Sequence, residues 1–484
     1  MIVSVEQMQT AEEQLFATGV EAEPLMDRAG LGIAQEVDRF FLVRGTVIAF
    51  VGPGHNGGDA LVAVRHLREM GWGIELRLVG RERFRPLTEK KLEQLGEVVA
   101  VAGGGELVLL DGLLGIGARG PVRGDIAEAA AEMNSLRRER AARTVAIDLP
   151  SGLDGDTGEA YVGAVVADLT LTIAYPKAGL LADRATDHVG RLALVPLDEI
   201  EATGGDAGAV LIEPRHLAQV LPRRNFDTHK GMAGRVGVIA GSRGLTGAAI
   251  LCSAAAVRGG AGLVTLFVPG DLYPIVAQCA IPEVMVKPVA TYAEVAGANL
   301  DVIAVGPGLG SDRAGEILDL VANDPRPCVV DAEALNMIAA GGVDILDQCH
   351  VPRLLTPHPG EFERLFPRGG RSRRQWAEDF SDRYPDVTLL LKGARTIIKE
   401  DGEPAAFNPT GHPGMATGGL GDVLTGLSAA LIAQGLSTYA AGCAASWLAG
   451  RSAELAIHGQ SEESFCASDA IQHLGAAFRS LRCR

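Results

Sequence analysis

The chain has 484 residues, which is too long for one ordinary hydrophobic core and predicts two or three domains. Apolar residues make up 47% of the sequence and charged residues 21%, a globular composition that excludes a disordered chain. The formal net charge of −16 argues against nucleic acid or an anionic membrane surface as a partner. No uncharged apolar stretch reaches the roughly 18 residues that a membrane span needs, and the first residues lack the features of a signal peptide.

The cysteines are scattered, form no CxxC pair and number seven. They are Cys252, Cys279, Cys328, Cys349, Cys443, Cys466 and Cys483. An odd, scattered set predicts reduced thiols, and with them a cytoplasmic protein.

Residues 1–205 alternate β-rich runs with helical patterns. Helices are expected over residues 4–18, 23–40, 57–70 and 125–137. Strands are expected over residues 46–52, 73–80, 107–112, 144–150, 168–174 and 191–197. Continuous Val, Ile and Leu runs of this length suit a parallel sheet that is covered on both faces. The predicted first domain is therefore a Rossmann-like three-layer α/β sandwich.

The periodicity is lost near residues 201–209, where Gly, Ala and acidic residues dominate, and residues 206–212 are interpreted as a linker. A second α/β series begins at GRVGVIAG, continues through LVTLFVP, VIAVGPG, CVVDA, RLLTPH and TLLLKG, and forms a domain over residues 213–484. It ends in Ala-rich helices, expected near residues 418–434, 438–459 and 468–481.

The first glycine loop, VGPGHNGGD, follows a strand and opens a helix. Gly52, Gly54 and Gly57 fit the G-x-G-x-x-G spacing of a dinucleotide-binding loop, and Glu75 has the spacing of its distal acid. Asp59 opposes that interpretation, because it would repel a pyrophosphate at the helix N-terminus. A purely structural turn is the other alternative.

Polar side chains follow several predicted strands of this first domain. They are Asn56, Asp59, Asp111, Asp148 and Ser151. Each Asp by itself would suit a helix cap or turn, but ligands of open parallel sheets bind beyond the carboxyl ends of strands. Oxygen ligands of this kind suit a hard cation, and a carboxylate beside a ligand could transfer protons.

These motifs support a family resemblance over most of residues 1–205. GPGHNGGD, DGLLGIG, AIDLPSGLDGDTG and DLTLTIAYPKAG resemble the YjeF N-terminal family of NAD(P)H-hydrate epimerases. The resemblance implies that the substrate is lined by His55, Asn56, Gly57, Gly58 and Asp59 and by Gly115, Ile116, Gly117, Ala118, Arg119, Gly120 and Pro121. It also implies that Asn56, Asp111 and Ser151 hold a potassium ion and that Asp148 contacts the nicotinamide end. The sequence departs from the family at His55, usually Asn, and at Ala60, usually Gly.

The implied reaction interconverts the two C6 epimers of hydrated NADH or NADPH. The C6 hydroxyl lies next to ring N1, so the lone pair of N1 can expel it and leave a planar iminium that water attacks from either face. A carboxylate that shuttles the proton suffices, and we assign this role to Asp148.

The second half carries a different glycine motif, GMATGGLGD, which opens a long helix. No GxxxxGK[ST] loop occurs, so it is not a Walker A site. The amides of residues 418–421 would form an anion hole for a transferred phosphate. Asp422 would then face the acceptor hydroxyl and take its proton.

HKGMAG, GPGLG, LTPHPGEF, LKG and GMATGGLGD together resemble the ADP/ATP-dependent NAD(P)H-hydrate dehydratases of the ribokinase-like superfamily, roughly over residues 213–484. The resemblance implies that the hydrated nucleotide contacts Ala248, Gly308, Gly310, His358 and Asp422. It implies that the adenine nucleotide contacts Lys392, Gly393, Ala394, Arg395, Thr396 and Gly421, with Mg²⁺ bridging its phosphates and Glu361 as a distant helper.

The two resemblances together predict a bifunctional repair enzyme. One domain would epimerise R- and S-hydrates, and the other would dehydrate the S form at the expense of ADP. The catalytic residues would be Asp148 and Asp422. The expected partners are small molecules, hydrated NADH or NADPH and ADP, and a homo-oligomer is expected. The alternative is a kinase of a small alcohol that carries a non-catalytic N-terminal binding module.

Overall fold

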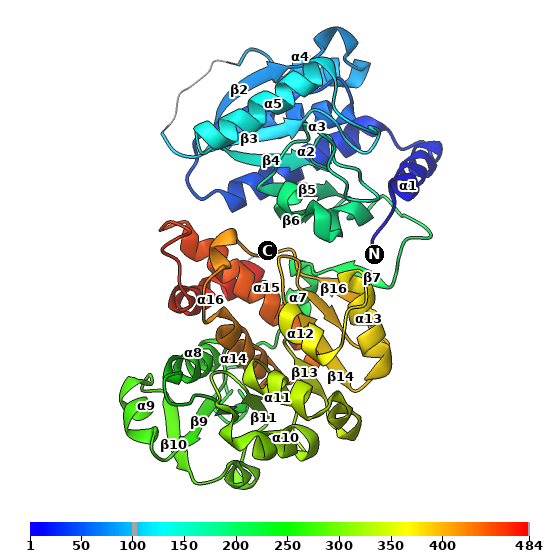
Figure 1. Ribbon diagram of the computed structural model, residues 1–484. Helices are drawn as coiled ribbons and strands as arrows, with labels where there is room; N and C mark the ends of the chain where they lie inside the picture. The colour runs from blue at the N-terminus through cyan, green and yellow to red at the C-terminus, as the bar shows by residue number, and fades with distance from the viewer. Residues whose placement is uncertain (99–103, 483–484) are drawn as a thin grey trace. The chain divides into compact units, whose positions relative to one another are not determined.

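The computed structural model describes residues 1–98 and 104–482, so Cys483 lies outside the described residues. The chain divides into two compact units, Met1–Ala209 (unit 1) and Val210–Arg484 (unit 2), each with its own sheet (Figure 1). Over the described residues, no helix combines the length and the apolar character that a membrane crossing requires. The six described cysteines are free thiols.

Unit 1 is built on a six-stranded sheet in the order β2-β1-β3-β4-β5-β6. All its strand pairs are parallel. The strands are β1 (Thr46–Val51), β2 (Gly73–Leu78), β3 (Leu107–Gly112), β4 (Arg143–Ile147), β5 (Leu169–Ile173) and β6 (Arg191–Val195). The helices are α1 (Val5–Ala17), α2 (Ala22–Phe40), α3 (His55–Glu69), α4 (Pro86–Leu95), α5 (Gly124–Glu139) and α6 (Thr186–Val189), with short 3₁₀ helices η1 (Arg81–Arg83), η2 (Ala178–Leu181) and η3 (Asp183–Ala185).

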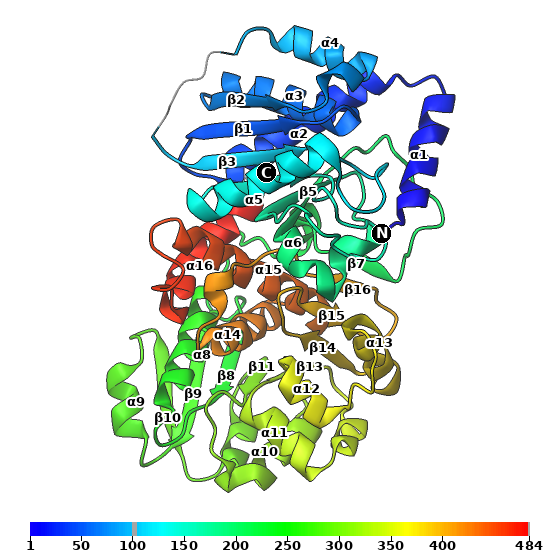
Figure 2. The same cartoon turned by 45° about the horizontal axis from the view of Figure 1, so that its top comes forward.

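Both faces of this sheet are buried, as the continuous apolar runs predict. Successive side chains of a strand point to opposite faces. In β1, Val47, Ala49 and Val51 pack into the cluster that α2 and α3 cover. Ile48 and Phe50 pack instead against α5. The three-layer α/β architecture predicted for unit 1 is therefore confirmed (Figure 2).

The turn between β1 and α3 is tighter than the sequence indicates. The helix begins at His55, two residues before the expected start at residue 57, so His55 and Asn56 belong to its first turn. A Cβ atom on Gly57 would lie 2.0 Å from the carbonyl oxygen of Gly52. Glycine at position 57 is thus what lets the helix start directly behind the strand end, where its first turn reaches the site.

Unit 2 contains a ten-stranded sheet in the order β10-β9-β8-β11-β12-β13-β14-β15-β16-β7. The strands are β7 (Ala209–Leu211), β8 (Arg235–Ile239), β9 (Leu263–Pro269), β10 (Val284–Val289), β11 (Val302–Val305), β12 (Cys328–Val330), β13 (Arg353–Leu355), β14 (Val387–Leu391), β15 (Ile397–Lys399) and β16 (Ala405–Phe407). The helices are α7 (Pro214–Val220), α8 (Thr246–Arg258), α9 (Tyr273–Cys279), α10 (Ala314–Asn323), α11 (Glu333–Gly341), α12 (Pro359–Leu365), α13 (Arg373–Arg383), α14 (Leu420–Ala433), α15 (Thr438–Ile457) and α16 (Ala467–Arg482), with 3₁₀ helices η4 (Tyr292–Gly297), η5 (Ser311–Arg313), η6 (Val343–Gln348) and η7 (Pro413–Met415).

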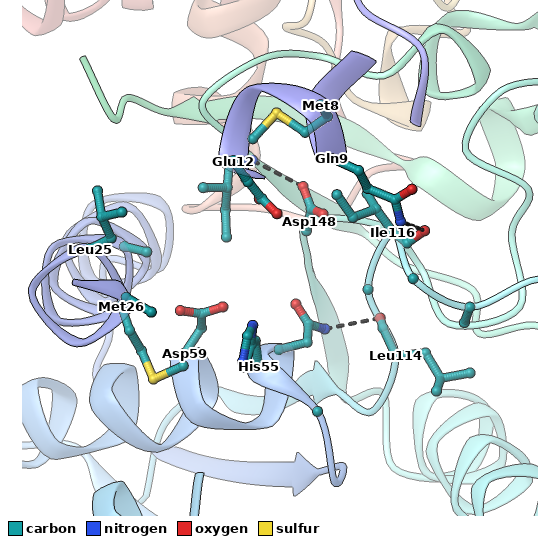
Figure 3. Close-up of a pocket in the computed structure, with 18 of the residues that line it drawn as sticks. Met8, Gln9, Glu12, Leu25, Met26, His55, Asp59, Leu114, Ile116 and Asp148 are labelled. Atoms are coloured by element: carbon teal, nitrogen blue, oxygen red, sulfur yellow. Dashed lines mark hydrogen bonds between the residues drawn. The ribbon is translucent and has the colours of Figure 1, made fainter. Parts of the chain in front are cut away.

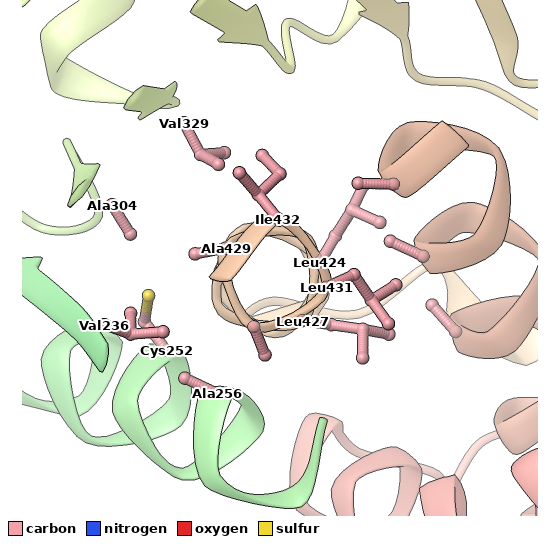
Figure 4. Close-up of a cluster of buried hydrophobic side chains, with 14 of the residues drawn as sticks. Val236, Cys252, Ala256, Ala304, Val329, Leu424, Leu427, Ala429, Leu431 and Ile432 are labelled. Atoms are coloured by element: carbon pink, nitrogen blue, oxygen red, sulfur yellow. The ribbon is translucent and has the colours of Figure 1, made fainter. Parts of the chain in front are cut away.

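The core of unit 2 surrounds α14. Figure 4 shows this helix end-on, with Val236, Ala304 and Val329 of the sheet on one side and Cys252 and Ala256 of α8 on another. Gly426 lets the two helices approach closely, because a Cβ atom there would lie 2.0 Å from the carbonyl oxygen of Cys252. This packing fixes the N-terminal turn of α14 relative to the strand ends.

Four strands of this sheet were missed by the sequence patterns. β10 reads VMVKPV, in which polar residues interrupt the apolar run, and β7, β15 and β16 have three residues each. β15 pairs antiparallel with both β14 and β16, which ends the parallel part of the sheet. β7 lies within residues 206–212, which were interpreted as a linker, and the two units divide between Ala209 and Val210.

Candidate active sites

A cavity of about 860 Å³ lies at the carboxyl ends of the strands of unit 1. The segments that follow all six strands of the sheet contribute to it, and α1 and α2 line its other side (Figure 3). This is where an open parallel sheet binds its ligands. The sequence-predicted residues that line it are His55, Asn56, Asp59, Gly115, Ile116, Gly117, Ala118 and Asp148. The lining does not include the other predicted positions, Gly57, Gly58, Arg119, Gly120 and Pro121.

Asp148 follows β4 in an unusual backbone conformation. Its φ of 65° lies in the left-handed region, which Asp tolerates better than most residues. Its amide donates to Leu171 O at 2.8 Å, and its Oδ1 accepts the amide of Ile173 at 3.2 Å. Its carboxylate forms an ion pair with Lys177. These contacts hold the side chain at the deep end of the cavity.

Lys177 is a site residue that sequence reasoning did not assign. Its side chain is fully buried, and its ammonium donates to Asp148 Oδ1, to Ile173 O at 2.9 Å and to Thr172 Oγ1 at 3.4 Å. An ammonium has three donors, and these three partners use them. The only sequence signal was a lysine in YPKAG directly after an apolar strand.

Glu12 is the second site residue that was missed. It lies on α1, one turn after the buried Met8, and points toward Asp148 (Figure 3). Burial and the negative charge of Asp148 raise the pKa of Glu12 to about 7. On α3, burial raises the pKa of Asp59 well above its ordinary value, and repulsion from Asp148 and Glu12 adds to the shift. An acid on the apolar stripe of an amphipathic helix is the signal that could have revealed Glu12.

The three residues predicted to hold potassium lie together at the wall of this cavity, where Asn56 belongs to the lining. Asp111 is fully buried, and its carboxylate accepts the hydroxyl of Ser151 at 2.7 Å and the amide of Ser151 at 2.8 Å. Leu114 links the set, because its amide donates to Ser151 Oγ at 3.0 Å and its carbonyl accepts the side chain of Asn56 at 2.9 Å.

Burial raises the pKa of Asp111 to about 6, since no cationic side chain among the described residues pairs with it. A buried carboxylate, a hydroxyl and an amide form an oxygen donor set that fits a hard cation such as K⁺.

Two arginine side chains also belong to the lining of the cavity. They are Arg83 and Arg85, and Arg85 Nη1 lies 3.3 Å from His55 Nε2. Arg83 is already paired with Glu82 at 3.0 Å and Asp125 at 2.5 Å. Burial and the charge of Arg85 lower the pKa of His55, which favours a neutral imidazole. The cavity lining therefore combines carboxyl groups with basic side chains.

In unit 2, Asp422 occupies the first turn of α14, beside buried charged groups. The N-cap is Gly419 at a φ of 93°. Lys392 Nζ lies 2.8 Å from Asp331 Oδ1, and Thr425 Oγ1 donates to Asp331 Oδ2 at 2.8 Å. Burial raises the pKa of Asp422 to about 7, repulsion from Asp331 adds to the shift, and attraction to Lys392 opposes it.

Asp331 also belongs to this site. It stands in the CVVDA motif, but the sequence analysis assigned it no role. It follows β12, and Lys392 follows β14, two strands away in the sheet. Burial opposes the ionised form of Asp331, but the contacts with Lys392 and Thr425 prevail and lower its pKa. A Cβ atom on Gly421 would lie 3.3 Å from Lys392 Nζ, so Gly421 contacts the same pair.

His358 joins this group through Glu361. The His358 ring caps α12, because Nδ1 accepts the amides of Gly360 at 3.0 Å and Glu361 at 3.3 Å. Glu361 Oε1 lies 3.5 Å from His358 Nε2, and its Oε2 lies 3.8 Å from Lys392 Nζ. The exposed His358 and the buried Lys392–Asp331 pair are thereby connected through one carboxylate.

The GPGLG loop contacts α8, as the joint assignment of Ala248 and Gly308 requires. A Cβ atom on Gly308 would lie 2.9 Å from the Cβ of Ala248, and one on Gly310 would lie 3.6 Å from the Cβ of Ser242. The backbone of Gly308 is also hydrogen-bonded to the Glu333 carboxylate, whose pKa burial raises.

The predicted nucleotide segment, residues 392–396, forms the turn between β14 and β15. Gly393 and Ala394 are exposed and Thr396 is half-buried, whereas the side chain of Arg395 is buried. Arg373 holds this turn, because its guanidinium donates to Lys392 O and Arg395 O, both at 3.0 Å. Arg395 therefore offers a ligand its backbone more readily than its guanidinium.

Folds of these two kinds, with carboxyl groups gathered at strand ends, define a class: two-domain α/β enzymes that act on small molecules by acid–base and group-transfer chemistry. Comparison with known proteins makes this specific. Residues 22–179 match the family described as YjeF-related protein N-terminus, and residues 236–474 match the family described as NAD(P)H-hydrate dehydratase.

Relatives cover nearly the full chain. The bifunctional NAD(P)H-hydrate repair enzyme Nnr of Moorella thermoacetica is 34% identical over 94% of this chain and 92% of its own length. The protein of that name from Coxiella burnetii is 33% identical over 97% of both chains. The chain therefore belongs to the family of bifunctional NAD(P)H-hydrate repair enzymes.

One solved structure confirms the ribokinase-like fold predicted for unit 2. A ribokinase-like superfamily protein of Enterococcus faecalis V583 is similar, with a TM-score of 0.51 and 29% identity over 57% of this chain and 96% of that chain. The ADP/ATP-dependent NAD(P)H-hydrate dehydratase of Bacillus subtilis, co-crystallised with ATP and Mg²⁺, has a TM-score of 0.49 and 27% identity over 56% of this chain and 98% of that chain.

Proposed function

We propose that unit 1 interconverts the R and S epimers of hydrated NADH and NADPH, and that unit 2 dehydrates the S epimer at the expense of ADP. The family to which the chain belongs supports both activities, since its two parts match the two family descriptions. The observation that carries the dehydratase assignment is the position of Asp422, which lies in the first turn of a glycine-capped helix beside the Lys392–Asp331 pair.

In unit 2, the S hydrate lies against Ala248, Gly308, Gly310 and His358, with its C6 hydroxyl facing Asp422. The ionised Asp422 takes the hydroxyl proton while the oxygen attacks the terminal phosphorus of ADP. The helix N-terminus and Lys392 stabilise the negative charge of the phosphoryl group. The phosphate then leaves C6 with its electron pair, C5 loses a proton, and the dihydropyridine ring is restored.

The adenine nucleotide lies along residues 392–396 and Gly421 in this proposal. Mg²⁺ would be held mainly by the phosphates, because the described residues contain no group of three His, Cys, Asp or Glu side chains placed to hold a metal. Mg²⁺ typically uses one or two carboxylates together with phosphates, so Glu361 is a sufficient protein contribution. Its charge would neutralise the phosphates in the transition state.

In unit 1, the nicotinamide end lies against Asp148, and the rest of the dinucleotide lies along His55 and the 115–121 loop. The Asp148 carboxylate shuttles the proton between the C6 hydroxyl and water. K⁺ at Asn56, Asp111 and Ser151 would neutralise the buried Asp111 and fix the loops that follow β3 and β4. The cytoplasmic location and the homo-oligomer stay predictions.

The test uses the full chain and the purified hydrates. With S-NADHX, ADP and Mg²⁺ we expect stoichiometric formation of NADH, AMP and phosphate, and ATP in place of ADP shows the preferred donor. With R-NADHX we expect the same products, because unit 1 supplies the S epimer. Failure to form NADH, with phosphorylation of a hydroxymethyl pyrimidine or thiazole instead, would show a small-alcohol kinase and contradict the proposal.

A further inference from the structure

The cavity of unit 1 carries carboxyl groups on two of its walls. Glu12 and Asp148 come from one side, on α1 and after β4, and Asp59 rises from α3 on the other side (Figure 3). The family match to the N-terminal unit begins at residue 22, so α1 lies outside it. Glu12 therefore needs an explanation from this chain's own geometry.

The position of α1 over the cavity is fixed by several contacts. The amide of Val3 donates to Pro176 O at 3.0 Å, and Val3 forms a β-bridge with Lys177. Ser4 caps the helix through a reciprocal pair of hydrogen bonds with Gln7. Met8 is 1% exposed and anchors the helix in the core. Residues 176 and 177 thus position both acids. Their backbone holds the start of α1, which carries Glu12, and the Lys177 side chain holds Asp148.

Asp148 is not well placed to carry an exchangeable proton. Its carboxylate is paired with Lys177, and the ammonium has no donor left for a second carboxyl group. Glu12 and Asp59, in contrast, have no hydrogen-bond or ion-pair partner for their carboxyl groups within residues 1–98 and 104–482. The half-buried Glu12 and the buried Asp59 thus face, without partners, a cavity that is large enough for a ring substrate.

We propose that Glu12 and Asp59 are the two proton-transfer groups of the epimerisation, one for each face of the ring, while Asp148 stays in its ion pair with Lys177. This inference rests on the epimerase function proposed above. It changes the role that the sequence assigned to Asp148 from proton shuttle to charge stabiliser. It also adds α1 to the active site.

The step balances as follows. A protonated carboxyl on one wall gives its proton to the C6 hydroxyl, the C6–O bond breaks, and water leaves while the N1 lone pair forms the N1=C6 double bond. A second water adds to C6 from the other face, the π electrons return to N1, and the carboxylate on that wall takes the proton. The two groups have then exchanged protonation states, so the enzyme form left by one epimer is the form that accepts the other.

The charges around these groups suit that exchange. Glu12 lies near Glu13 on its own helix, near Asp148 and Lys177 on the same side of the cavity, and opposite Asp59, and its pKa of about 7 allows both forms near neutral pH. Asp59 faces Asp148 and Glu12, and its pKa is also raised, mainly by burial. Neighbouring carboxyl groups that repel each other tend to share one proton, which is the state that the cycle needs.

The test measures epimerisation and oxygen exchange separately, with the full chain, NADHX and no nucleotide, so that dehydration does not occur. We expect Glu12→Gln and Asp59→Asn each to slow R–S interconversion by at least about 100-fold. In ¹⁸O-labelled water each variant should still exchange the C6 hydroxyl of one epimer. This is the epimer whose hydroxyl is protonated by the acid that remains. The retained epimer should be opposite in the two variants.

Glu6→Gln on α1 and Glu69→Gln on α3 are matched controls, because both side chains are exposed and neither lines the cavity. They should keep interconversion and exchange at the unaltered rates. ADP-dependent dehydration of pure S-NADHX should survive in every variant and report an intact chain. Equal loss of exchange for both epimers, or interconversion that survives in either variant, would overturn the inference. If the unaltered chain fails to interconvert the epimers, the proposed epimerase function itself is wrong.

Discussion

The Lys392 ammonium lies 2.8 Å from the Asp331 carboxylate, although 61 residues separate them in the chain. The pair lies beside the first turn of α14, and both of its members act on Asp422 with opposite sign. Burial raises the pKa of the proposed base most, and a charge pair to which Asp422 does not itself belong adjusts it further.

The first prediction is that the dehydratase reaction has an acid limb controlled by Asp422. A general base must be ionised, and the pKa of Asp422 is raised to about 7. We expect kcat/KM for S-NADHX to be level above pH 7 and to fall about tenfold per pH unit below it. Asp422→Asn should lower dehydration by about 10²–10⁴-fold and remove the acid limb, while R–S epimerisation is unchanged. Full dehydratase activity in this variant would rule out Asp422 as the base.

The second prediction concerns Asp331. Replacing it by Asn removes the carboxylate that repels the ionised Asp422 and leaves the attraction of Lys392, so the pKa of Asp422 should fall. The acid limb of the dehydratase profile should move clearly below pH 7. The free energy of unfolding of unit 2 should drop by about 1–3 kcal/mol, because Lys392 is mostly buried and loses its partner.

Thr425→Val is the matched control for this variant. It removes the hydrogen bond of an uncharged hydroxyl to the same carboxylate and keeps the charge pair, so we expect a loss of about 1.5–3 kcal/mol and an acid limb that stays near pH 7. An unshifted limb in Asp331→Asn would show that this carboxylate does not control Asp422.

Sequence patterns marked the candidate site residues that lie at strand ends and helix starts. Asp111, Asp148, His358, Lys392 and Asp422 all follow strands or open a helix, and a glycine or proline motif marks each of these places. Glu12 lacks any such marker, because it is one acid among several on an ordinary amphipathic helix. Only the packing of α1 over the end of the sheet shows that this acid faces the cavity.

The roles of Asp331 and Lys177 were missed for a related reason. Both stood in quoted motifs, but their function depends on partners that approach from other strands. The fold shows the same limit. Apolar runs that lead into a motif identified the central parallel strands, including the three-residue β12 and β13, whereas the equally short β7, β15 and β16 lead into no such motif and were missed.

The third prediction is that K⁺ stabilises unit 1 through Asp111. A carboxyl whose pKa is raised on folding favours the protonated folded state, so stability falls as the pH rises from about 4 in the unfolded chain to about 6 in the folded one. A bound cation offsets this loss. At pH 8 we expect K⁺ to raise the thermal midpoint of unit 1 relative to choline at equal ionic strength. At a K⁺ concentration of ten times the dissociation constant, the free energy of unfolding should rise by about 1.4 kcal/mol.

The effect should shrink at pH 5, where Asp111 is largely protonated, and should vanish in Asp111→Asn. Differential scanning calorimetry of the full chain, with the transition of unit 2 as an internal reference, measures both. A midpoint that responds equally to K⁺ and choline would remove K⁺ from the proposal.

The last prediction is that Gly308 is required by the geometry of the dehydratase site. Its φ of 62° lies in the left-handed region, and a Cβ atom there would lie 2.7 Å from Leu245 O and 2.9 Å from the Cβ of Ala248. Gly308→Ala should therefore push the GPGLG loop away from α8, destabilise unit 2 by about 1–3 kcal/mol and raise KM for S-NADHX, with epimerisation unaffected. Gly315→Ala is the matched control, since it lies in α10 with nothing within 4 Å of the added Cβ and should stabilise by about 0.4–1 kcal/mol. If Gly308→Ala behaves like this control in both unfolding and substrate titration, the close approach of the loop to α8 has no part in binding the hydrate.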